Sequence, residues 1–508
     1  MNPGTERATI VLEISALTQQ WVRKRSLSGT LWLTGAGAAI SIANLGIFVV
    51  VARLIQPMEF GIVSFAAVFI EFLRLTCLSV FTDAVIRRPE VDDTTNSTTF
   101  WTAMLAGGLC LAVCVLIAAP LAERYYASGS GWIFAVLALI LPLEASRCVH
   151  EGLLKRSFQY REIAWRLTAA TLGGGLLAIP LALVGMGAWA LVIQRLGVSA
   201  LQLVISWRVL PWRPAWRFSV AETRTLLRFC SQAGSGRVLL GIGERVPEAI
   251  IGAFTGPEAL AYYRVGARGL DSISQLAVQP PASVALSALS RVKPEDYEAQ
   301  FLRILRLVSI IAVPAYFGAG VLAPEFVQLM FGPKWDQSAV VMSCLALAAA
   351  PCIMGALIGP LLLAAGHPRL LATTALANIC FIGGPVLVAS FISLPAVAVA
   401  QLLGSHAGLL VTTAMVIRTM GFSGARLFKI LKPPFLAAGS MALTLVLSKH
   451  IMGQLHPVLT LMVLSGAGAG LYGCLLLMFA RDYALIAWRE LDPLLPERLR
   501  VAKTEPRV

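Results

Sequence analysis

Charged side chains are scarce in this sequence, and long polar stretches are scarcer still. Only 13% of the 508 residues are charged and 57% are hydrophobic, whereas soluble proteins carry about 25% charged residues. The apolar residues fall in runs of about 20, the length at which a helix crosses the hydrocarbon core of a bilayer. Because a backbone in lipid must satisfy its own hydrogen bonds, these runs predict an all-α membrane protein and exclude a set of soluble domains.

The residue patterns of several common sites are also missing. The nine cysteines are scattered singly, with neither metal-ligand spacing nor a disulfide framework. The sequence has no Gly-rich phosphate loop ending in Gly-Lys-Ser/Thr and no His-Glu-x-x-His. The segments between the apolar runs are too short for a soluble catalytic domain. We therefore expect no catalytic residues, no metal and no cofactor.

The apolar runs number fourteen, and each predicts one transmembrane helix. Their approximate limits are 29–52, 60–82, 98–120, 131–149, 163–184, 187–207, 229–252, 261–287, 302–323, 338–360, 370–391, 395–417, 433–449 and 457–479.

Basic residues between these runs are distributed unequally. With the N-terminus in the cytoplasm, 28 of the 41 Lys and Arg residues fall on the cytoplasmic side, four fall outside and nine lie within spans. This asymmetry follows the positive-inside rule, so both tails, 1–28 and 481–508, are predicted to be cytoplasmic. Residues 1–28 have no apolar core near the start and no small-residue cleavage site, so we expect no signal peptide.

The first twelve spans read as two copies of one six-span unit. The segment Ala52-Arg-Leu-Ile-Gln-Pro-Met-Glu-Phe-Gly61 enters span 2, and Gly252-Ala-Phe-Thr-Gly-Pro-Glu-Ala-Leu260 enters span 8 in the same way. Copies with an even number of spans insert with the same orientation, so a parallel repeat around a central cavity is predicted. The predicted parts are an N-lobe at 29–228, a C-lobe at 229–431 and two extra helices within 432–480.

Four short segments carry a resemblance to a known family: residues 52–63, Ala84-Val-Ile-Arg-Arg88, Thr99-Phe-Trp101 and Gly256-Pro-Glu-Ala-Leu-Ala-Tyr-Tyr-Arg264. They resemble Wzx-type polysaccharide flippases of the multidrug/oligosaccharidyl-lipid/polysaccharide (MOP) exporter superfamily, whose fourteen-helix branch has the same 6+6+2 layout. The resemblance implies a transporter that moves undecaprenyl-diphosphate-linked oligosaccharides from the cytoplasmic to the periplasmic leaflet of the bacterial inner membrane. It further implies alternating access, membrane lipids around the protein, a proton or sodium gradient as in antiporters, and a polymerase of the same pathway as a partner. Nucleic acid is not expected as a partner.

Nine arginines lie within the predicted spans, where a charge must face protein or water. Arg147, Arg166 and Arg306 are close to cytoplasmic ends and are expected to snorkel. Six are deeper, and because guanidinium groups bind phosphate bidentately, we expect them to hold the lipid diphosphate. These six are Arg74, Arg195, Arg237, Arg245, Arg264 and Arg268.

Two of the spans place these charges on one helix face. Arg264, Arg268, Asp271 and Gln275 follow the spacing i, i+4, i+7, i+11 on span 8, and Arg237, Gly241, Glu244 and Glu248 do so on span 7. The alternative to substrate binding is a set of interhelical ion pairs, in which Glu71 faces Arg74 and Glu244, Glu248 and Asp271 neutralise the others. As the resemblance implies ion coupling, the acidic candidates for it are Glu71, Asp83, Glu244 and Asp271.

Three other functions remain open at this stage. An ion-coupled exporter of small amphipathic compounds in the same superfamily would have twelve spans and a less cationic interior. A membrane glycosyltransferase or polymerase would need acid/base or metal-binding carboxylates, often on large outer loops. A scaffold without transport activity would not need paired repeats with charges inside the membrane. The six deep arginines favour an anionic substrate.

Overall fold

The computed structural model describes residues 40–88, 92–452, 456–481 and 483, and these residues form helices and no strand. The predicted cytoplasmic tail 1–28 lies outside the described residues, as does nearly all of 481–508. The described chain divides into two compact units. Unit 1 takes in residues 40–56 and 66–241, and unit 2 takes in residues 57–65 and those from 242 onward. The predicted lobe boundaries stay a prediction.

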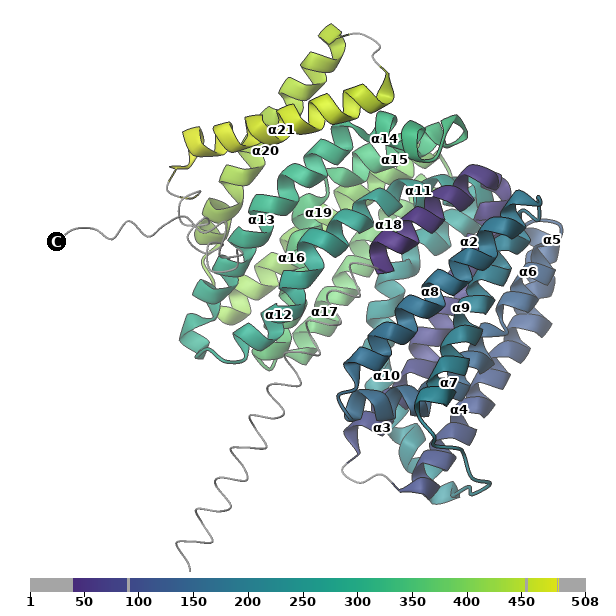
Figure 1. Ribbon diagram of the computed structural model, residues 1–508. Helices are drawn as coiled ribbons and strands as arrows, with labels where there is room; N and C mark the ends of the chain where they lie inside the picture. Colours follow the sequence, from purple (N-terminus) through teal and green to yellow (C-terminus); the bar gives the residue numbers. More distant parts are fainter. Residues whose placement is uncertain (1–39, 89–91, 453–455, 482, 484–508) are drawn as a thin grey trace, which may run out of the picture. The chain divides into compact units, whose positions relative to one another are not determined.

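Unit 1 is a bundle of helices in which some spans are built from two consecutive pieces (Figure 1). It begins with a helix at Ile40–Leu54. Its further elements are α2 (Pro57–Leu73, whose first nine residues belong to unit 2), the π-helical turn η1 (Arg74–Leu78), α3 (Ser79–Arg87), α4 (Asp93–Val113), the π turn η2 (Cys114–Ala118), α5 (Ala119–Tyr125), α6 (Ser130–Leu137), α7 (Ile140–Arg156), α8 (Tyr160–Leu183), α9 (Ala188–Val209) and most of α10 (Val220–Ile250).

Unit 2 has the same kind of construction (Figure 1). Its elements after α10 are the π turn η3 (Ile251–Thr255), α11 (Pro257–Ile273), the π turn η4 (Ser274–Val278), α12 (Gln279–Leu289), the 3₁₀ turn η5 (Pro294–Asp296), α13 (Tyr297–Val321), α14 (Ala323–Met330), the 3₁₀ turn η6 (Pro333–Trp335), α15 (Asp336–Ala346), α16 (Ala349–Ala364), α17 (Pro368–Asn378), the π turn η7 (Ile379–Gly383), α18 (Gly384–Ala389), α19 (Leu394–Met420), α20 (Gly424–Met452) and α21 (Pro457–Phe479).

The internal repeat expected from the sequence is visible in the lengths of the elements. Helices α2 and α11 both have 17 residues, both start with a proline and both lead into a five-residue π turn. Proline suits the first position of a helix because its fixed φ is helical and no N–H is needed there. The later break between α6 and α7 likewise corresponds to the break between α15 and α16. The two copies therefore share these two features, although other breaks differ: α8 is continuous, whereas its counterpart is divided into α17, η7 and α18.

Fewer helices qualify as membrane spans than the fourteen predicted. Ten described helices are long and apolar enough to cross a bilayer, and the pair Pro333–Ala346 and Ala349–Ala364, bent by 60°, would make eleven. Predicted spans 7 and 8 form α10 and α11–α12 but do not meet this composition test. Part of predicted span 1 lies outside the described residues, and the rest is the short helix Ile40–Leu54. A count of fourteen is thus not confirmed, whereas the all-α membrane fold is.

The first turns of α2 and α11 pack closely in unit 2. A Cβ atom added to Gly61 of α2 would overlap the backbone carbonyl of Pro257 at the start of α11. The fully buried ring of Trp335 lies against both helices, with ring centroids 5.7 Å from Phe60 and 5.9 Å from Tyr262. Only glycine permits the backbones of α2 and α11 to approach this closely. Small residues commonly allow such close packing between membrane helices, because lipid provides no hydrophobic driving force for helix association.

Candidate functional site

Arg74 and Glu71 form one end of an ion-pair network inside unit 1. Arg74 lies in the π turn η1, and its Nη2 and Nε donate to Glu71 Oε2 at 2.7 and 2.9 Å. On the neighbouring helix α7, Glu144 Oε2 lies 3.9 Å from Arg74 Nη1. A single π turn inside an α-helix is frequent at functional sites. The predicted ion pair between Glu71 and Arg74 is therefore confirmed, and Arg74 has a second carboxylate nearby.

Two carboxylates of α7 continue this network. Arg147 Nη2 donates to Glu144 Oε2 at 2.6 Å, and Arg147 Nη1 lies 3.4 Å from Glu151 Oε2. Arg166 of α8 pairs with Glu151 and donates from Nη1 to Ser206 Oγ of α9 at 2.8 Å. The pairs join three helices, α7, α8 and α9.

The expectation that Arg147 and Arg166 snorkel to the membrane surface is wrong. Their residues are 8% and 1% exposed, and both guanidinium groups are held by Glu144 or Glu151. A buried charge is stable in a protein when it is paired and hydrogen-bonded, and the two acidic residues of α7 supply those partners. Arg306, the third residue of this group, lies in α13 and its guanidinium carbon is 5.6 Å from the ring centre of Tyr483.

Unit 2 has a second cluster with a different charge balance. Arg245 Nη1 of α10 lies 3.3 Å from Glu248 Oε2, and Arg264 Nη2 of α11 donates to the same oxygen at 2.9 Å. Two guanidinium groups thus share one carboxylate. Beside them, Tyr263 donates from its hydroxyl to Gln401 Oε1 of α19 at 2.8 Å. Among the side chains that the structure describes, Arg245, Arg264 and Glu248 together keep one net positive charge, and spare N–H donors remain because each guanidinium group carries five.

The rest of the predicted stripe on span 8 lies along the polar side of α11 and η4. Arg264 and Arg268 are half-buried, and Asp271 and Gln275 are exposed. The side-chain carboxylate of Asp271 makes no hydrogen bond or ion pair with any residue that the structure describes. The α-helical backbone therefore places Arg264, Arg268 and Asp271 on one helix face, as their spacing requires, whereas Gln275 lies in the π turn that follows.

The remaining predicted site residues lie on helices α3, α9 and α10. Arg195 in α9 and Asp83 in α3 are half-buried. Arg237 and Glu244 belong to α10, but their side chains lie outside the described part of the structure. That any of the ten predicted residues binds substrate or an ion stays a prediction.

Four functional candidates in unit 1 are absent from the predicted set. Glu144, Glu151, Ser199 and Ser206 all lie on the network, and Ser199 Oγ donates to Glu144 Oε1 at 3.4 Å. A signal for two of them exists in the sequence, because Glu144, Arg147 and Glu151 are spaced i, i+3, i+7 on one helix face. The two serines carry no such signal, since serine is common in apolar helices.

The linker between α9 and α10, residues 210–219, is bound to one end of unit 1. Ala215 accepts at its carbonyl oxygen from Trp101 Nε1 at 2.9 Å, and its N–H donates to Ser97 Oγ at 3.0 Å. Trp216 stacks on Trp101 with a centroid distance of 4.5 Å. The extended backbone of the linker thus takes its hydrogen bonds from side chains of α4 rather than from a helix of its own.

Solved structures with a similar fold are transporters. The lipid II flippase MurJ in an inward closed conformation has a TM-score of 0.70 at 13% identity, over 89% of this chain and 99% of that chain. A MATE family multidrug resistance transporter of the MOP superfamily, inward-facing, has a TM-score of 0.52 at 15% identity, over 76% of this chain and 94% of its own. The chain therefore shares the fold of these two membrane transporters over most of its length.

The sequence comparison is more specific. The model of the family described as "Polysaccharide biosynthesis protein" matches residues 50–340. The chain belongs to this family, which together with the fold points to a transporter rather than a catalyst.

Three curated relatives have similar sequences. Succinoglycan biosynthesis transport protein ExoT of Rhizobium meliloti (strain 1021) is 25% identical over 59% of this chain and 61% of its own length. Teichuronic acid biosynthesis protein TuaB of Bacillus subtilis (strain 168) is 23% identical, over 69% and 73%. Lipopolysaccharide biosynthesis protein WzxC of Escherichia coli (strain K12) is 23% identical, over 68% and 70%. The match to ExoT thus spans less than two thirds of that relative.

Proposed function

We propose that this protein moves undecaprenyl-diphosphate-linked oligosaccharide repeat units from the cytoplasmic to the periplasmic leaflet for polysaccharide biosynthesis. The observation that carries the proposal is the cluster of unit 2, in which Arg245 and Arg264 share the single carboxylate of Glu248. Membership of the polysaccharide biosynthesis protein family supports the same substrate class. A lipid diphosphate is a multiply charged anion, and this cluster has positive charge to spare.

The chemistry of the cluster suits reversible capture of a diphosphate. Phosphate oxygens accept bidentate hydrogen bonds from a guanidinium group, and such charge-assisted bonds are roughly twice as strong as neutral ones. Glu248 holds both guanidinium groups while no anion is present, so they stay paired during the return step. An incoming diphosphate takes over donors of Arg245 and Arg264 that Glu248 does not occupy. In unit 1, Arg74 is available for the same exchange with Glu71 and Glu144.

The remaining parts of the proposal follow from charge distribution and family. The protein would lie in the bacterial inner membrane with both termini in the cytoplasm, as the excess of basic residues on one side supports. It would work by alternating access and hand its cargo to a polymerase of the same pathway. A proton or sodium gradient would drive it through the acidic set Glu71, Asp83, Glu244 and Asp271. Asp271 is the best placed of these, because no described side chain pairs with it.

Because Arg245 and Arg264 share one carboxylate, substitution of either arginine distinguishes a role in substrate binding from a purely structural role. Removing either arginine alone leaves a one-to-one pair with Glu248, so a structural role predicts that Arg264→Gln and Arg245→Gln keep both protein level and transport. Substrate binding predicts normal protein level and at least a tenfold loss of transport, the result of losing about 1.5–3 kcal/mol of charge-assisted hydrogen bonding.

The assay is complementation of a flippase-deficient strain, scored by lipid-linked repeat units that accumulate in the cytoplasmic leaflet. Arg224→Gln, an exposed arginine near the start of α10, is the matched control. Full complementation by both cluster variants would refute the proposal. A strain in which the wild-type protein does not reduce the accumulation would refute the substrate class itself.

A further inference from the structure

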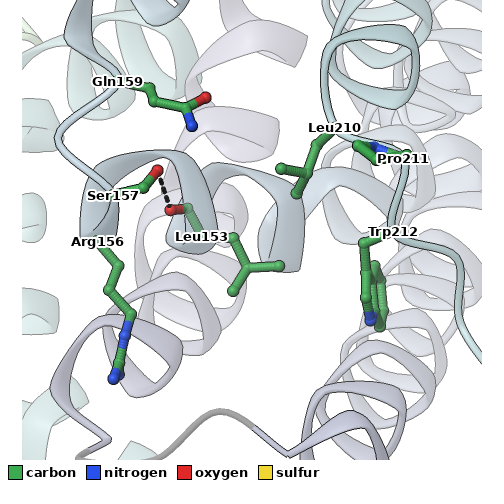
Figure 2. Close-up of a pocket in the computed structure, with 7 residues that line it drawn as sticks. All are labelled: Leu153, Arg156, Ser157, Gln159, Leu210, Pro211 and Trp212. Atoms are coloured by element: carbon green, nitrogen blue, oxygen red, sulfur yellow. Dashed lines mark hydrogen bonds between the residues drawn. The ribbon is translucent and has the colours of Figure 1, made fainter.

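A groove of about 650 Å³ opens at the end of unit 1 where α7 turns into α8. Figure 2 shows the polar side chains of Arg156, Ser157 and Gln159 along one side of it. None of these residues belongs to the two ion-pair clusters described above. The groove is therefore a separate feature of unit 1.

The polar side of the groove is a strained and firmly bonded turn. Phe158, between Ser157 and Gln159, has a φ of 55°, the single positive value among the described residues other than glycine. An aromatic residue rarely adopts this left-handed conformation, and such strain persists where the surroundings over-determine it. Here the N–H of Gln159 donates to Leu154 O at 3.0 Å and Ser157 Oγ donates to Leu153 O at 2.9 Å. These bonds hold the backbone of the turn and the hydroxyl group of Ser157 in place.

The opposite side of the groove is apolar and is fixed by the linker. It consists of Leu210, Pro211 and Trp212, which follow α9 (Figure 2). The carbonyl oxygen of Trp212 lies 3.2 Å from His150 Nε2, and the Trp212 ring meets the Phe100 ring edge-on at 6.2 Å. The groove is therefore formed by anchored elements on both sides.

The residues around the groove are of the types that membrane proteins place at the level of the lipid headgroups. Arg208, Arg213 and Arg217 are exposed next to it, and the side chain of Trp216 is exposed by 89%. Arginine and tryptophan gather at the level of the headgroups in membrane proteins, and basic residues there attract the anionic lipids of the cytoplasmic leaflet. The charge count of the sequence places this end of unit 1 on the cytoplasmic side.

Acidic residues at this end do little to offset that charge. Glu151 points into the network and pairs with Arg166, and Glu222 of α10 pairs with Arg88 at 3.2 Å. Glu162 of α8 is half-buried, and the exposed Asp92 and Asp93 at the start of α4 are outnumbered by the basic residues of this end, Lys155, Arg156, Arg161, Arg208, Arg213 and Arg217. The described surface near the groove therefore keeps a positive balance, which complements an anion with an apolar tail.

We propose that this groove binds an anionic phospholipid of the cytoplasmic leaflet. The phosphate lies against Arg156 and Gln159, and one acyl chain lies along Leu153, Leu210 and Trp212. Arg156 already donates to the carbonyl oxygen of Arg88, and its five-donor guanidinium group can bind a phosphate oxygen as well. This lipid is a resident component and not the cargo, so the inference does not depend on the proposed transport function.

Native mass spectrometry of the purified full chain in detergent tests the proposal, with phosphatidylglycerol and phosphatidylcholine as probes. The wild-type protein should bind phosphatidylglycerol more tightly than phosphatidylcholine. Gln159→Glu keeps the side-chain shape but adds a negative charge at the phosphate position. It should weaken phosphatidylglycerol about fivefold, the effect of one charge at headgroup level, and leave phosphatidylcholine unchanged.

Two further variants keep the test decisive. Leu210→Trp narrows the groove on its apolar side and should weaken the binding of both lipids, while Thr225→Glu adds the same charge at an exposed site on α10 outside the groove. Equal binding of the two lipids by the wild-type protein would overturn the proposal. So would an equal effect of Thr225→Glu and Gln159→Glu, which would indicate a diffuse surface charge rather than a site. Each variant is compared at equal monodispersity, so a folding defect is recognised independently.

Discussion

Loss of the Glu151 carboxylate should destabilise unit 1 more than any other single charge removal in its network. Glu151 is the carboxylate that pairs with Arg166 among the described residues, whereas Arg147 would keep Glu144 at 2.6 Å. Glu151→Gln therefore leaves one guanidinium group, on a residue 1% exposed, without an anion. Breaking a buried pair in this way costs about 3–5 kcal/mol.

The size of this effect can be measured as a melting temperature. For a folding unit of 150–250 residues, 1 kcal/mol shifts the melting temperature by roughly 2–4 °C. We therefore expect the apparent melting temperature of the purified Glu151→Gln protein, followed by tryptophan fluorescence, to fall by roughly 6–20 °C. Arg161→Gln, an exposed charge on the same helix as Arg166, is the control and should shift it by less than about 2 °C.

A double variant separates an unpaired charge from a lost contact. Replacing both members of a buried ion pair by apolar groups of similar size is often neutral or stabilising. Glu151→Leu combined with Arg166→Met should therefore recover most of the loss caused by Glu151→Gln. If the double variant melts below the single one, or if the single one melts like the wild-type protein, the ion-pair account of this network is wrong.

Three further predictions concern packing and hydrogen bonds. Gly61→Ala should lower the yield of folded protein because its Cβ overlaps a backbone carbonyl of α11, whereas Gly108→Ala, with no atom within 4 Å of its Cβ, should not; size-exclusion chromatography compares the two. Tyr263→Phe leaves Gln401 without its 2.8 Å donor and should destabilise unit 2 by about 1–2 kcal/mol, measured as a lower melting temperature. Ser97→Ala removes a hydrogen bond to the linker and should speed trypsin cleavage after Arg217, because the Arg213–Pro214 bond of the linker resists trypsin; unchanged cleavage would show that the hydrogen bond does not hold the linker.

The helices and their internal repeat could be predicted because both depend on local pattern. Apolar runs of bilayer length and a proline followed by an acidic residue at two corresponding places are visible in the sequence. The span count could not be settled in the same way. Segments such as 220–250 and 257–289 are helices, but no stretch of bilayer length within them is both apolar enough and sufficiently free of charge to qualify as a span by composition.

The site could be predicted only where the partners are close in sequence. Glu71 and Arg74 are three residues apart on one helix, and their pair is confirmed. The pairing of Arg166 with Glu151 joins two helices, and no pattern along either helix states which of its faces meets the other. Arg166 is close to the end of an apolar run, and for that reason the sequence predicted that its side chain snorkels. In the folded protein the packing of α7 against α8 instead buries Arg166 next to Glu151.

The equal lengths of α2 and α11, each followed by a π turn, carry information about history. A π turn holds one residue more than the α-helical turn that it replaces. That extra residue follows 17 helical residues in α2 and again in α11. A single insertion in an ancestral six-helix gene, followed by duplication and fusion, accounts for both turns, whereas independent origins would require the same insertion twice. The widened turn is then older than the two-unit protein, and Arg74 and Ser274, which now occupy its first position, record how the descendants diverged.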